Sequence, residues 1–456
     1  MNKVMAWVKA NVWIVVLSAV ILIVLPAGWV GSSMWNKNIR TARQKEVDDN
    51  RTKLNGVKEI AYSLKAVVPG EELPEHRGVP NEKTIEMYAK LRAQQDEQVA
   101  GVVKMAGEIN SRGHAPLIDG LFPQPSEADR QTKVLEFMGA LVPTKDPSNP
   151  SAYEKLLASI GAGGPPAIDV VLQSLKDAAQ REKERFRAAG NNAEPTEAEQ
   201  KEIAAALVNQ RLAQYKAQAE LISVYGTMDV FPKLTNEVWP QIPDTRLTTP
   251  PTVERCFTWQ CDYWTVQDVL GAVKLANTGA GGKPTMVPDS VVKRIESVRL
   301  GPPPWVSQSS GEEGAPSAVD PSSALIAPSY STSVTGRYGG KANQLYDVRT
   351  VRLTAVVSLP RLPQFFNAIS KSNFMTVIGV NLRPVNITND LGSGYYYGTE
   401  AVVRAEIDIE CVWLRIWTTP FIPDSIRTSL GIKPAAKEGE PEAPSDAPKS
   451  SGKGGR

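Results

Sequence analysis

Histidine and cysteine are scarce in this chain, which has two histidines and three cysteines among its 456 residues. His76 and His114 lie far apart in polar, loop-like sequence, so a zinc site would lack ligands. The chain has no G-x-S-x-G, H-E-x-x-H or Walker sequence, and no G-x-G-x-x-G that opens a helix. We therefore predict no catalytic residues, no metal site and no cofactor, and interpret the protein as a non-enzyme.

An excess of charge of one sign is also lacking. Lys and Arg number 51 against 49 Asp and Glu, which gives a formal net charge of +2. No basic patch interleaved with aromatic residues is present, so the sequence gives no electrostatic reason to expect nucleic acid as a partner. Hydrophobic residues make up 42% and charged residues 22%, which is typical of a folded, water-soluble body.

The few cysteines allow two interpretations. Cys256 and Cys261 are close together in ERCFTWQCDYW, while Cys411 lies in a strand pattern. An oxidising compartment would permit a small disulfide loop between Cys256 and Cys261. Residues five apart on one strand point to opposite faces, however, which disfavours that bond. Buried free thiols are the favoured interpretation, with the disulfide as the alternative.

One long apolar run is present, and it extends from Val12 to Val30 without a charged side chain. As a helix rising about 1.5 Å per residue, such a run covers about 30 Å, the thickness of a bilayer core. Trp13 near one end and Trp29 near the other are typical of an interfacial aromatic belt. We predict a transmembrane helix over residues 12–34, preceded by a cytoplasmic tail over residues 1–11.

A cleaved signal peptide is the alternative to an uncleaved anchor. Signal peptides usually have an apolar region of about 7–15 residues followed by small residues at the cleavage site. Here the run is longer, and bulky Met34 and Trp35 follow it. The membrane anchor is therefore favoured.

The orientation signal is mixed because basic residues lie on both sides of the run. Lys3 and Lys9 precede it, and strict counting of the basic residues after it would place the body in the cytoplasm. A short tail with two lysines and a free amine is easily retained inside, however, and long domains cross regardless of local charge. We predict a single-pass protein of the bacterial inner membrane with its body in the periplasm.

The middle of the chain is helical in pattern. Apolar residues recur at spacings of three and four from Trp35 to about Val68 and from Glu82 to about Ile109. A coiled-coil-like helical stalk over residues 35–112 and helices packed on their own domain are equal alternatives. A further helical region is predicted over residues 113–245, with long helices at Ala167 to Ala189 and Glu194 to Val224. A scaffold or spacer role is favoured there over a partner-binding insertion.

Residues 246–425 are predicted to form a C-terminal body. Alternating apolar and polar residues predict half-buried strands from Val351 to Leu359 and from Val403 to Trp413. Further strands are predicted at Val291 to Leu300 and Phe374 to Val385, with helices at Thr265 to Ala276 and Pro360 to Lys371. Residues 301–342 are predicted to be a mobile loop and residues 426–456 a disordered tail.

A Gly-rich segment between two of these strands carries three consecutive tyrosines. Tyr395, Tyr396 and Tyr397 lie in Asp390 to Gly398 and look like the most exposed aromatic residues of the body. They are interpreted either as the tip of a hairpin or as a contact for a partner, and the sequence does not separate these alternatives.

Two carboxylates and two tryptophans on the last strand invite a functional interpretation. Glu406 and Asp408 share a strand face with Arg404, and we interpret them as a solvated edge. A catalytic pair would instead need a cleft and one raised pKa. Trp413 and Trp417 are interpreted as core or rim packing rather than as the cap of a ligand groove.

The order of elements predicts an α+β fold. If Val253 to Gln260 is a first strand, the body has two β-α-β halves, a ferredoxin-like α/β sandwich. The strand–helix–strand segment Val351 to Leu382, the element order, the anchor and the stalk resemble the PilO/PilN and GspM/GspL families. These are bitopic inner-membrane proteins of type IV pilus and type II secretion machines. Trp259, Trp264 and the VVKRI segment also resemble uncharacterised planctomycete-type membrane proteins.

The resemblance to the pilus and secretion families covers about half of the chain and has functional implications. It implies a non-enzymatic scaffold or assembly component, present as a homodimer or as a heterodimer with a similar bitopic protein. Exposed strand edges and helix faces would supply the contacts. The alternative is a membrane-tethered periplasmic enzyme or ligand-binding protein with a pocket between the helical region and the sheet.

Overall fold

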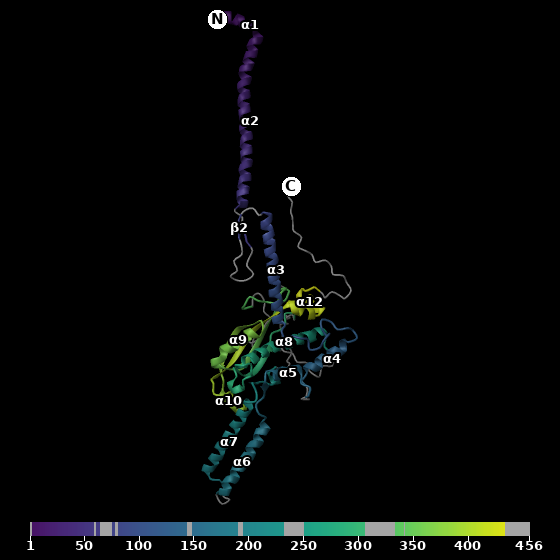
Figure 1. The fold of residues 1–456 in the computed structure, drawn as a ribbon, viewed down its shortest axis with the longest axis vertical. Helices are drawn as coiled ribbons and strands as arrows, with labels where there is room; N and C mark the ends of the chain where they lie inside the picture. Colours follow the sequence, from purple (N-terminus) through teal and green to yellow (C-terminus); the bar gives the residue numbers. More distant parts are fainter. Residues whose placement is uncertain are drawn as a thin grey trace, which may run out of the picture. The chain divides into compact units, whose positions relative to one another are not determined.

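The computed structural model describes most of the chain and divides it into two compact units (Figure 1). The first, Met1–Met105, is called the N-terminal unit below, and the second, Ala106–Arg456, is called the body. The described residues are 2–58, 61–63, 75–77, 81–143, 148–189, 195–231, 250–305, 333–341 and 343–433.

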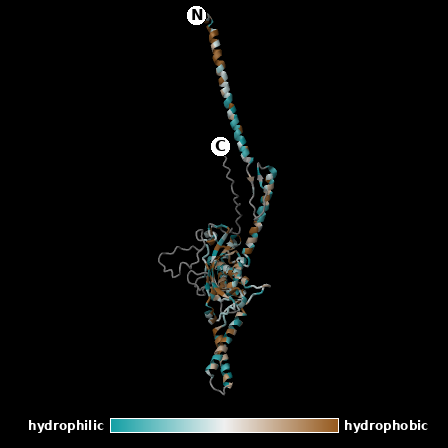
Figure 2. Cartoon of the chain, turned by 90° about the vertical axis from the view of Figure 1, so that its left-hand side faces the viewer, coloured by the Kyte–Doolittle hydropathy of each residue, from teal (hydrophilic) through white to brown (hydrophobic). Residues whose placement is uncertain are grey.

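The N-terminal unit is built around one long helix. Its elements are α1 (Asn2–Ala10), α2 (Val12–Lys58), the short antiparallel strands β1 (Ala61–Tyr62) and β2 (His76–Arg77), and most of α3 (Glu82–Asn110). Figure 2 shows that apolar residues gather in the first part of α2 and polar residues in the second. The apolar stretch is long enough to cross a membrane, and none of its most hydrophobic 18-residue window is buried against described residues.

The structure corrects one sequence prediction in this unit, because the helix expected to reach Val68 ends at Lys58. The predicted tail of residues 1–11 includes helix α1. Beyond Lys58, residues 61–62 form β1, and residues 64–68 lie outside the described part of the chain. The predicted second helix is confirmed as α3.

The body contains a six-stranded mixed sheet in the order β3-β4-β5-β6-β8-β7. Strands β3, β4 and β5 are parallel to their neighbours in this group. From β5 onward, through β6, β8 and β7, each strand is antiparallel to the next. The strands are β3 (Ala162–Gly163), β4 (Val224–Tyr225), β5 (Val292–Leu300), β6 (Tyr346–Ser358), β7 (Met375–Pro384) and β8 (Val402–Leu414).

The main part of this sheet is made by two successive helix–strand–strand segments. Helix α8 (Val253–Ala276) precedes β5 and β6, and α9 (Leu362–Ser372) precedes β7 and β8. The two helices pack against each other. Apolar side chains of both helices join those of the strands in one core, among them Trp264, Phe365 and Ile407.

Two short helices before the sheet complete the same core. These are α4 (Arg130–Leu141) and α5 (Ala152–Ser159), and the second begins at a capping box formed by Ser151 and Glu154. Phe137 and Tyr153 are fully buried in the core with the residues of α8. The predicted division between a helical region of residues 113–245 and a body of residues 246–425 is therefore wrong, because one core includes both.

Two longer helices form a separate arm. Figure 1 shows α6 (Ile168–Ala189) and α7 (Glu197–Ala219) side by side, and they contact each other along their length. A hydrogen bond from Gln214 to Ser174 joins them. Helix α7 begins at a second capping box, made by Thr196 and Glu199. The arm is the hairpin of two helices that we call the α6–α7 arm below.

Short elements close the body. They are the helices α10 (Ile387–Gly392), α11 (Arg415–Thr418) and α12 (Asp424–Leu430) and the 3-10 turns η1 (Met228–Val230), η2 (Val287–Asp289), η4 (Leu359–Arg361) and η5 (Thr419–Phe421). Helix α12 corrects the prediction of a disordered tail from residue 426, because Ile426 and Leu430 are buried in the core. Residues 434–456 and 306–332 lie outside the described part.

The strand predictions from Val291 onward are confirmed as β5, β6, β7 and β8, and the predicted helix after Pro360 is confirmed as α9. The proposed first strand at Val253 to Gln260 is wrong, because those residues form the first turns of α8. The helix predicted to begin at Thr265 is thus twice as long as expected.

Candidate functional site

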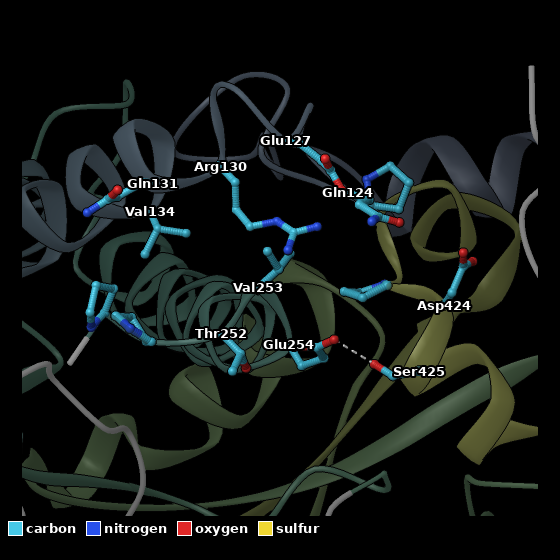
Figure 3. Close-up of a pocket in the computed structure, with 14 residues that line it drawn as sticks. Gln124, Glu127, Arg130, Gln131, Val134, Thr252, Val253, Glu254, Asp424 and Ser425 are labelled. Carbon is cyan, nitrogen blue, oxygen red and sulfur yellow. Dashed lines mark hydrogen bonds between the residues drawn. The ribbon is translucent and has the colours of Figure 1, made fainter.

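A groove of about 540 Å³ lies beside the start of α8. Its lining comes from the segment before and within α4, from the start of α8, and from the start of α12. Figure 3 shows Arg130 pointing into this groove toward Val253. The lining residues are Pro123, Gln124, Glu127, Arg130, Gln131, Val134, Pro250, Pro251, Thr252, Val253, Glu254, Pro423, Asp424 and Ser425.

The charge of this groove is mixed. Glu254 accepts a hydrogen bond of 2.9 Å from Ser425, drawn as a dashed line in Figure 3. Burial alone would raise the pKa of the Glu254 carboxyl, but hydrogen bonds from its own backbone, Thr252 and Ser425, together with nearby Arg130, lower it. A carboxylate held ionised by its neighbours suits binding of a polar or basic ligand rather than proton transfer at neutral pH.

The outward face of the sheet carries a chain of ion pairs. Arg352 on β6 makes two hydrogen bonds of 2.7 and 3.0 Å to Asp408 on β8, and the bond to Asp408 raises the Arg352 pKa. Glu406 lies 3.4 Å from Arg352. Arg404 donates two hydrogen bonds, of 2.7 and 2.9 Å, to the carboxylate of Glu296 on β5. The face is therefore held together by its own charges.

This arrangement corrects the interpretation of Glu406 and Asp408 as a solvated edge. Strand β8 lies between β6 and β7, so it is an interior strand, and both carboxylates are half-buried. Their neighbour Glu410 is only 1% exposed and accepts hydrogen bonds from Thr335 and Arg337. These acids therefore organise the sheet face.

The three tyrosines do not form an exposed hairpin tip. Tyr397 is 4% exposed and donates a 2.8 Å hydrogen bond to Asp390, while Tyr395 and Tyr396 are half-buried. Arg294 lies 3.8 Å above the Tyr395 ring, and the hydroxyl of Tyr225 accepts a hydrogen bond from the Tyr396 backbone. The segment predicted as a hairpin loop begins in the second half of helix α10, and its tyrosines pack it onto β4 and β5.

The same segment also holds the base of the α6–α7 arm. Arg211 of α7 donates a 2.7 Å hydrogen bond to the Gly392 carbonyl, and Lys216 lies 5.5 Å from the Tyr396 ring. Gln218 bonds the carbonyl of Gly164, which precedes the arm. The tyrosine segment thus fixes the arm on the sheet, which gives the three tyrosines an internal role.

The cysteines are free thiols, so the alternative of a disulfide between Cys256 and Cys261 is wrong. Both lie on α8, where five positions at about 100° each place them about 140° apart around the helix. Burial raises the pKa of Cys256 to about 12 and also raises that of Cys261. Cys411 is buried too, so the favoured interpretation of buried thiols is confirmed for all three.

The predicted membrane residues all lie on α2. Trp13 is 83% exposed and Trp29 is 76% exposed, while Val12 and Val30 are about half exposed. Because these aromatic and apolar side chains contact little of the described chain, they are available to an apolar environment outside the protein.

Sequence reasoning placed His114 in a polar loop and gave it no role. The structure buries it among Trp264, Trp413 and Trp417, and its ring stacks on Trp417 at 5.1 Å. This confirms packing rather than a ligand groove for Trp413 and Trp417. The partner of the His114 ring is Asp268, which lies 154 residues away, so no local signal could have revealed it.

Among the described residues, no group of three or more His, Cys, Asp or Glu side chains is placed to hold a metal ion. Comparisons of the chain with protein-family models, with curated proteins and with solved structures found no match. No relative therefore supplies a function, which has to be inferred from the residues and the fold.

Proposed function

We propose that this protein is a non-enzymatic scaffold of the bacterial envelope, anchored by α2 in the inner membrane with its body in the periplasm. The observation that carries the proposal is the first part of α2, a long apolar stretch left uncovered by described residues. A helix in the core of a soluble protein would be mostly buried. Joined to a charged body, such a stretch favours a membrane anchor over a core helix.

We further propose that the body is a rearranged ferredoxin-like sandwich. If β8 is counted before α8, the elements follow the order β-α-β-β-α-β that defines that fold. Strands β8 and β5 are then parallel with β6 between them, and β6 and β7 are parallel with β8 between them. This agreement supports the resemblance to pilus and secretion assembly proteins, with β8 in the place of the first strand that was predicted at Val253 to Gln260.

The α6–α7 arm supports a scaffolding role. Both of its ends return to the sheet, where Gln218 and Arg211 bond backbone carbonyls. A helix of about 22 residues is about 33 Å long, so the arm can offer partners a long surface while its base stays fixed. Exposed apolar residues such as Val208, which is 65% exposed, are suited to such a contact.

Cross-linking in native membranes tests this function. A photo-reactive amino acid at Val208 should capture membrane proteins of a pilus or secretion machine, identified by mass spectrometry. The same probe at Glu202, a polar position six residues earlier on α7, controls for random collision. Equal yields at the two positions, or no protein adduct at either, would argue against the scaffold.

The groove of Figure 3 favours a second candidate function, a tethered protein that binds a polar ligand. Arg130 and Glu254 are two of the charged groups that would contact such a ligand. If this function is correct, Arg130→Ala should abolish binding of the polar ligand and leave the cross-linked products at Val208 unchanged. A loss of those products would instead connect the groove with assembly.

A further inference from the structure

A buried polar cluster fixes the point at which the chain enters the body. It consists of Asn110 at the end of α3, His114 in the following loop, Asp268 on α8, and Asn373 after α9, and is called the His114 cluster below. Side chains of all four are at most 9% exposed. The residues come from three distant parts of the sequence, so their contacts hold these parts together.

The hydrogen bonds of Asn110 can be assigned without ambiguity. Its side-chain oxygen accepts from the Leu414 backbone N–H at 2.7 Å and from the Trp417 indole N–H at 2.7 Å. Its side-chain nitrogen donates to the Val412 carbonyl at 2.9 Å. Because an N–H can only donate and a carbonyl can only accept, the orientation of the Asn110 amide is fixed.

The orientation of Asn373 follows from the same logic. Its oxygen accepts from the Phe374 backbone N–H and from the Asn110 amide, so its nitrogen is the donor on the other side. That nitrogen donates to the Asn110 carbonyl at 3.2 Å and to Oδ1 of Asp268 at 3.0 Å. The Asn110 carbonyl oxygen and Oδ1 of Asp268 are therefore both acceptors.

His114 contacts these two acceptors with its two ring nitrogens. Nδ1 lies 3.1 Å from the Asn110 carbonyl oxygen, and Nε2 lies 3.0 Å from Oδ1 of Asp268. A neutral imidazole has only one N–H, so one nitrogen would direct its lone pair at an oxygen. We infer that His114 is an imidazolium paired with the Asp268 carboxylate, and that this buried ion pair is a proton-dependent latch on the last turn of α3.

The surroundings favour a cation at this position. The His114 ring stacks on Trp417 and contacts Trp264 and Trp413, whose electron-rich faces attract positive charge. Oδ2 of Asp268 is buried without a hydrogen-bond partner in the described chain, so the positive charge on His114 compensates the carboxylate.

The other titratable and charged groups near the pair do not replace His114. Cys411 on β8 is the nearest thiol, and its pKa is raised by burial first and then by Asp268. Arg349 on β6 also interacts with Cys411, but its guanidinium pairs with Asp262. His114 is therefore the cation that the Asp268 carboxylate contacts directly.

Loss of the proton should weaken the latch. One of the two contacts of His114 then becomes a repulsion between lone pairs, at a site where both side chains are buried. The Asn110 carbonyl belongs to the last turn of α3, so this turn loses its connection through His114 to Asp268 on α8. Removing one partner of a buried pair is costly, which makes the cluster suited to hold the last turn of α3 on α8.

Nitrogen-15 solid-state NMR of the full chain in lipid vesicles tests the inference. His76 and His114 are the only histidines, so the variant His76→Gln leaves a single labelled imidazole. At about pH 7.5, where a solvated histidine is largely neutral, both ring nitrogens should carry protons. A ring nitrogen without a proton at that pH would overturn the inference.

The variant Asp268→Asn, in the same background, tests the role of the carboxylate. It should leave one ring nitrogen without a proton and speed tryptic cleavage after exposed Arg112 by about tenfold or more. Asp424→Asn, an exposed acid on α12, is the matched control and should change neither result. An imidazolium that persists in Asp268→Asn would show that Asp268 has no part in the latch. If this variant does not fold, the NMR spectrum of the chain that keeps Asp268 still tests the inference.

Discussion

At the residue scale, the body uses buried charged groups as internal ties. Lys293 is fully buried, and its ammonium donates to the carbonyls of Val287 at 2.9 Å and Pro288 at 2.7 Å. Arg415 donates two hydrogen bonds, of 2.7 and 3.0 Å, to the carboxylate of Asp347. Such groups fix turns and strand ends in one arrangement, because leaving either partner alone in the interior is costly.

Lys293 gives a pH-dependent prediction. Burial lowers its pKa to about 8, while Glu400 acts in the opposite direction. The unfolded chain therefore binds more protons than the folded chain between about pH 8 and the ordinary lysine value near 10.4. The stabilisation by this group is fully present above the unfolded value and is lost as the pH falls through about 8.

The free energy of unfolding of the natural chain, measured against Lys293→Met, should rise between pH 8 and pH 10 by up to about 3 kcal/mol. A neutral amine still has N–H donors for both carbonyls, so the fold is preserved. Thermal unfolding of the full chain in detergent at several pH values measures the difference. A flat profile, or a fall with increasing pH, would contradict the burial of Lys293.

The thiols give a second prediction at this scale. Cys256, Cys261 and Cys411 are buried, and burial raises the pKa of each. A thiol reagent at about pH 8 should label none of them in the folded chain and all three after denaturation without reductant. Leu221→Cys, at a position 76% exposed, should react at once in the folded chain. Only one labelled thiol after denaturation would reveal a disulfide.

At the element scale, local pattern predicted some elements and missed others for physical reasons. Strand β8 was predictable because one face meets the core and the other meets charged partners, so its residues alternate. The first half of α8 was not, because Phe257, Trp259, Gln260 and Cys261 are all buried around the helix. A helix buried on every side lacks helical periodicity, and its aromatic residues favour strands.

The candidate sites show the same division. The apolar stretch of α2 could be read from consecutive residues, and so could the burial of the thiols. The tyrosine segment could not, because Tyr225 and Arg294, which cover Tyr395, come from strands more than a hundred residues earlier. The groove likewise combines three segments that are remote in sequence.

The turn after the tyrosines makes a testable contribution to the fold. Gly398 has a φ of +88°, and a Cβ there would lie 2.8 Å from the Pro288 carbonyl oxygen. Gly398→Ala should therefore lower the free energy of unfolding by about 2 kcal/mol or more, through strain and a backbone clash. Gly336→Ala is matched, because its φ is +77° with open space around the added Cβ. Equal losses in thermal unfolding would show that the contact with η2 is unimportant.

At the scale of the whole molecule, a helix long and apolar enough to span a membrane, an arm and a mixed α+β body occur in one chain. The proposed orientation predicts that alkaline phosphatase fused after Lys433 is active and that green fluorescent protein at the same junction is dark. The full-length mass should remain in the membrane fraction. Fluorescence at that junction would reverse the orientation, and a soluble product beginning near Ser32 would show a cleaved signal instead.

The predicted homodimer or heterodimer has to be tested with the full chain. Helices α4 and α5 share the core of the sheet, so the sheet cannot be separated from them. The sheet has two edge strands, β3 with only two residues, and β7, which has a bulge between Val377 and Gly379 and ends at Arg383 and Pro384. These features discourage pairing between strand edges. Helix faces, including those of the α6–α7 arm, are therefore the better candidates for contacts with a partner.

Sedimentation of the full chain in detergent tests the scaffold most directly, with the chain alone and mixed with bitopic proteins that are encoded by neighbouring genes. The scaffold account predicts a protein mass well above the 49.5 kDa of one chain, either as a homodimer or with such a partner. Val208→Glu on the arm should lower this mass, while Glu202→Gln should preserve it. A strictly monomeric chain at high micromolar concentration, both alone and in the mixtures, would contradict the account.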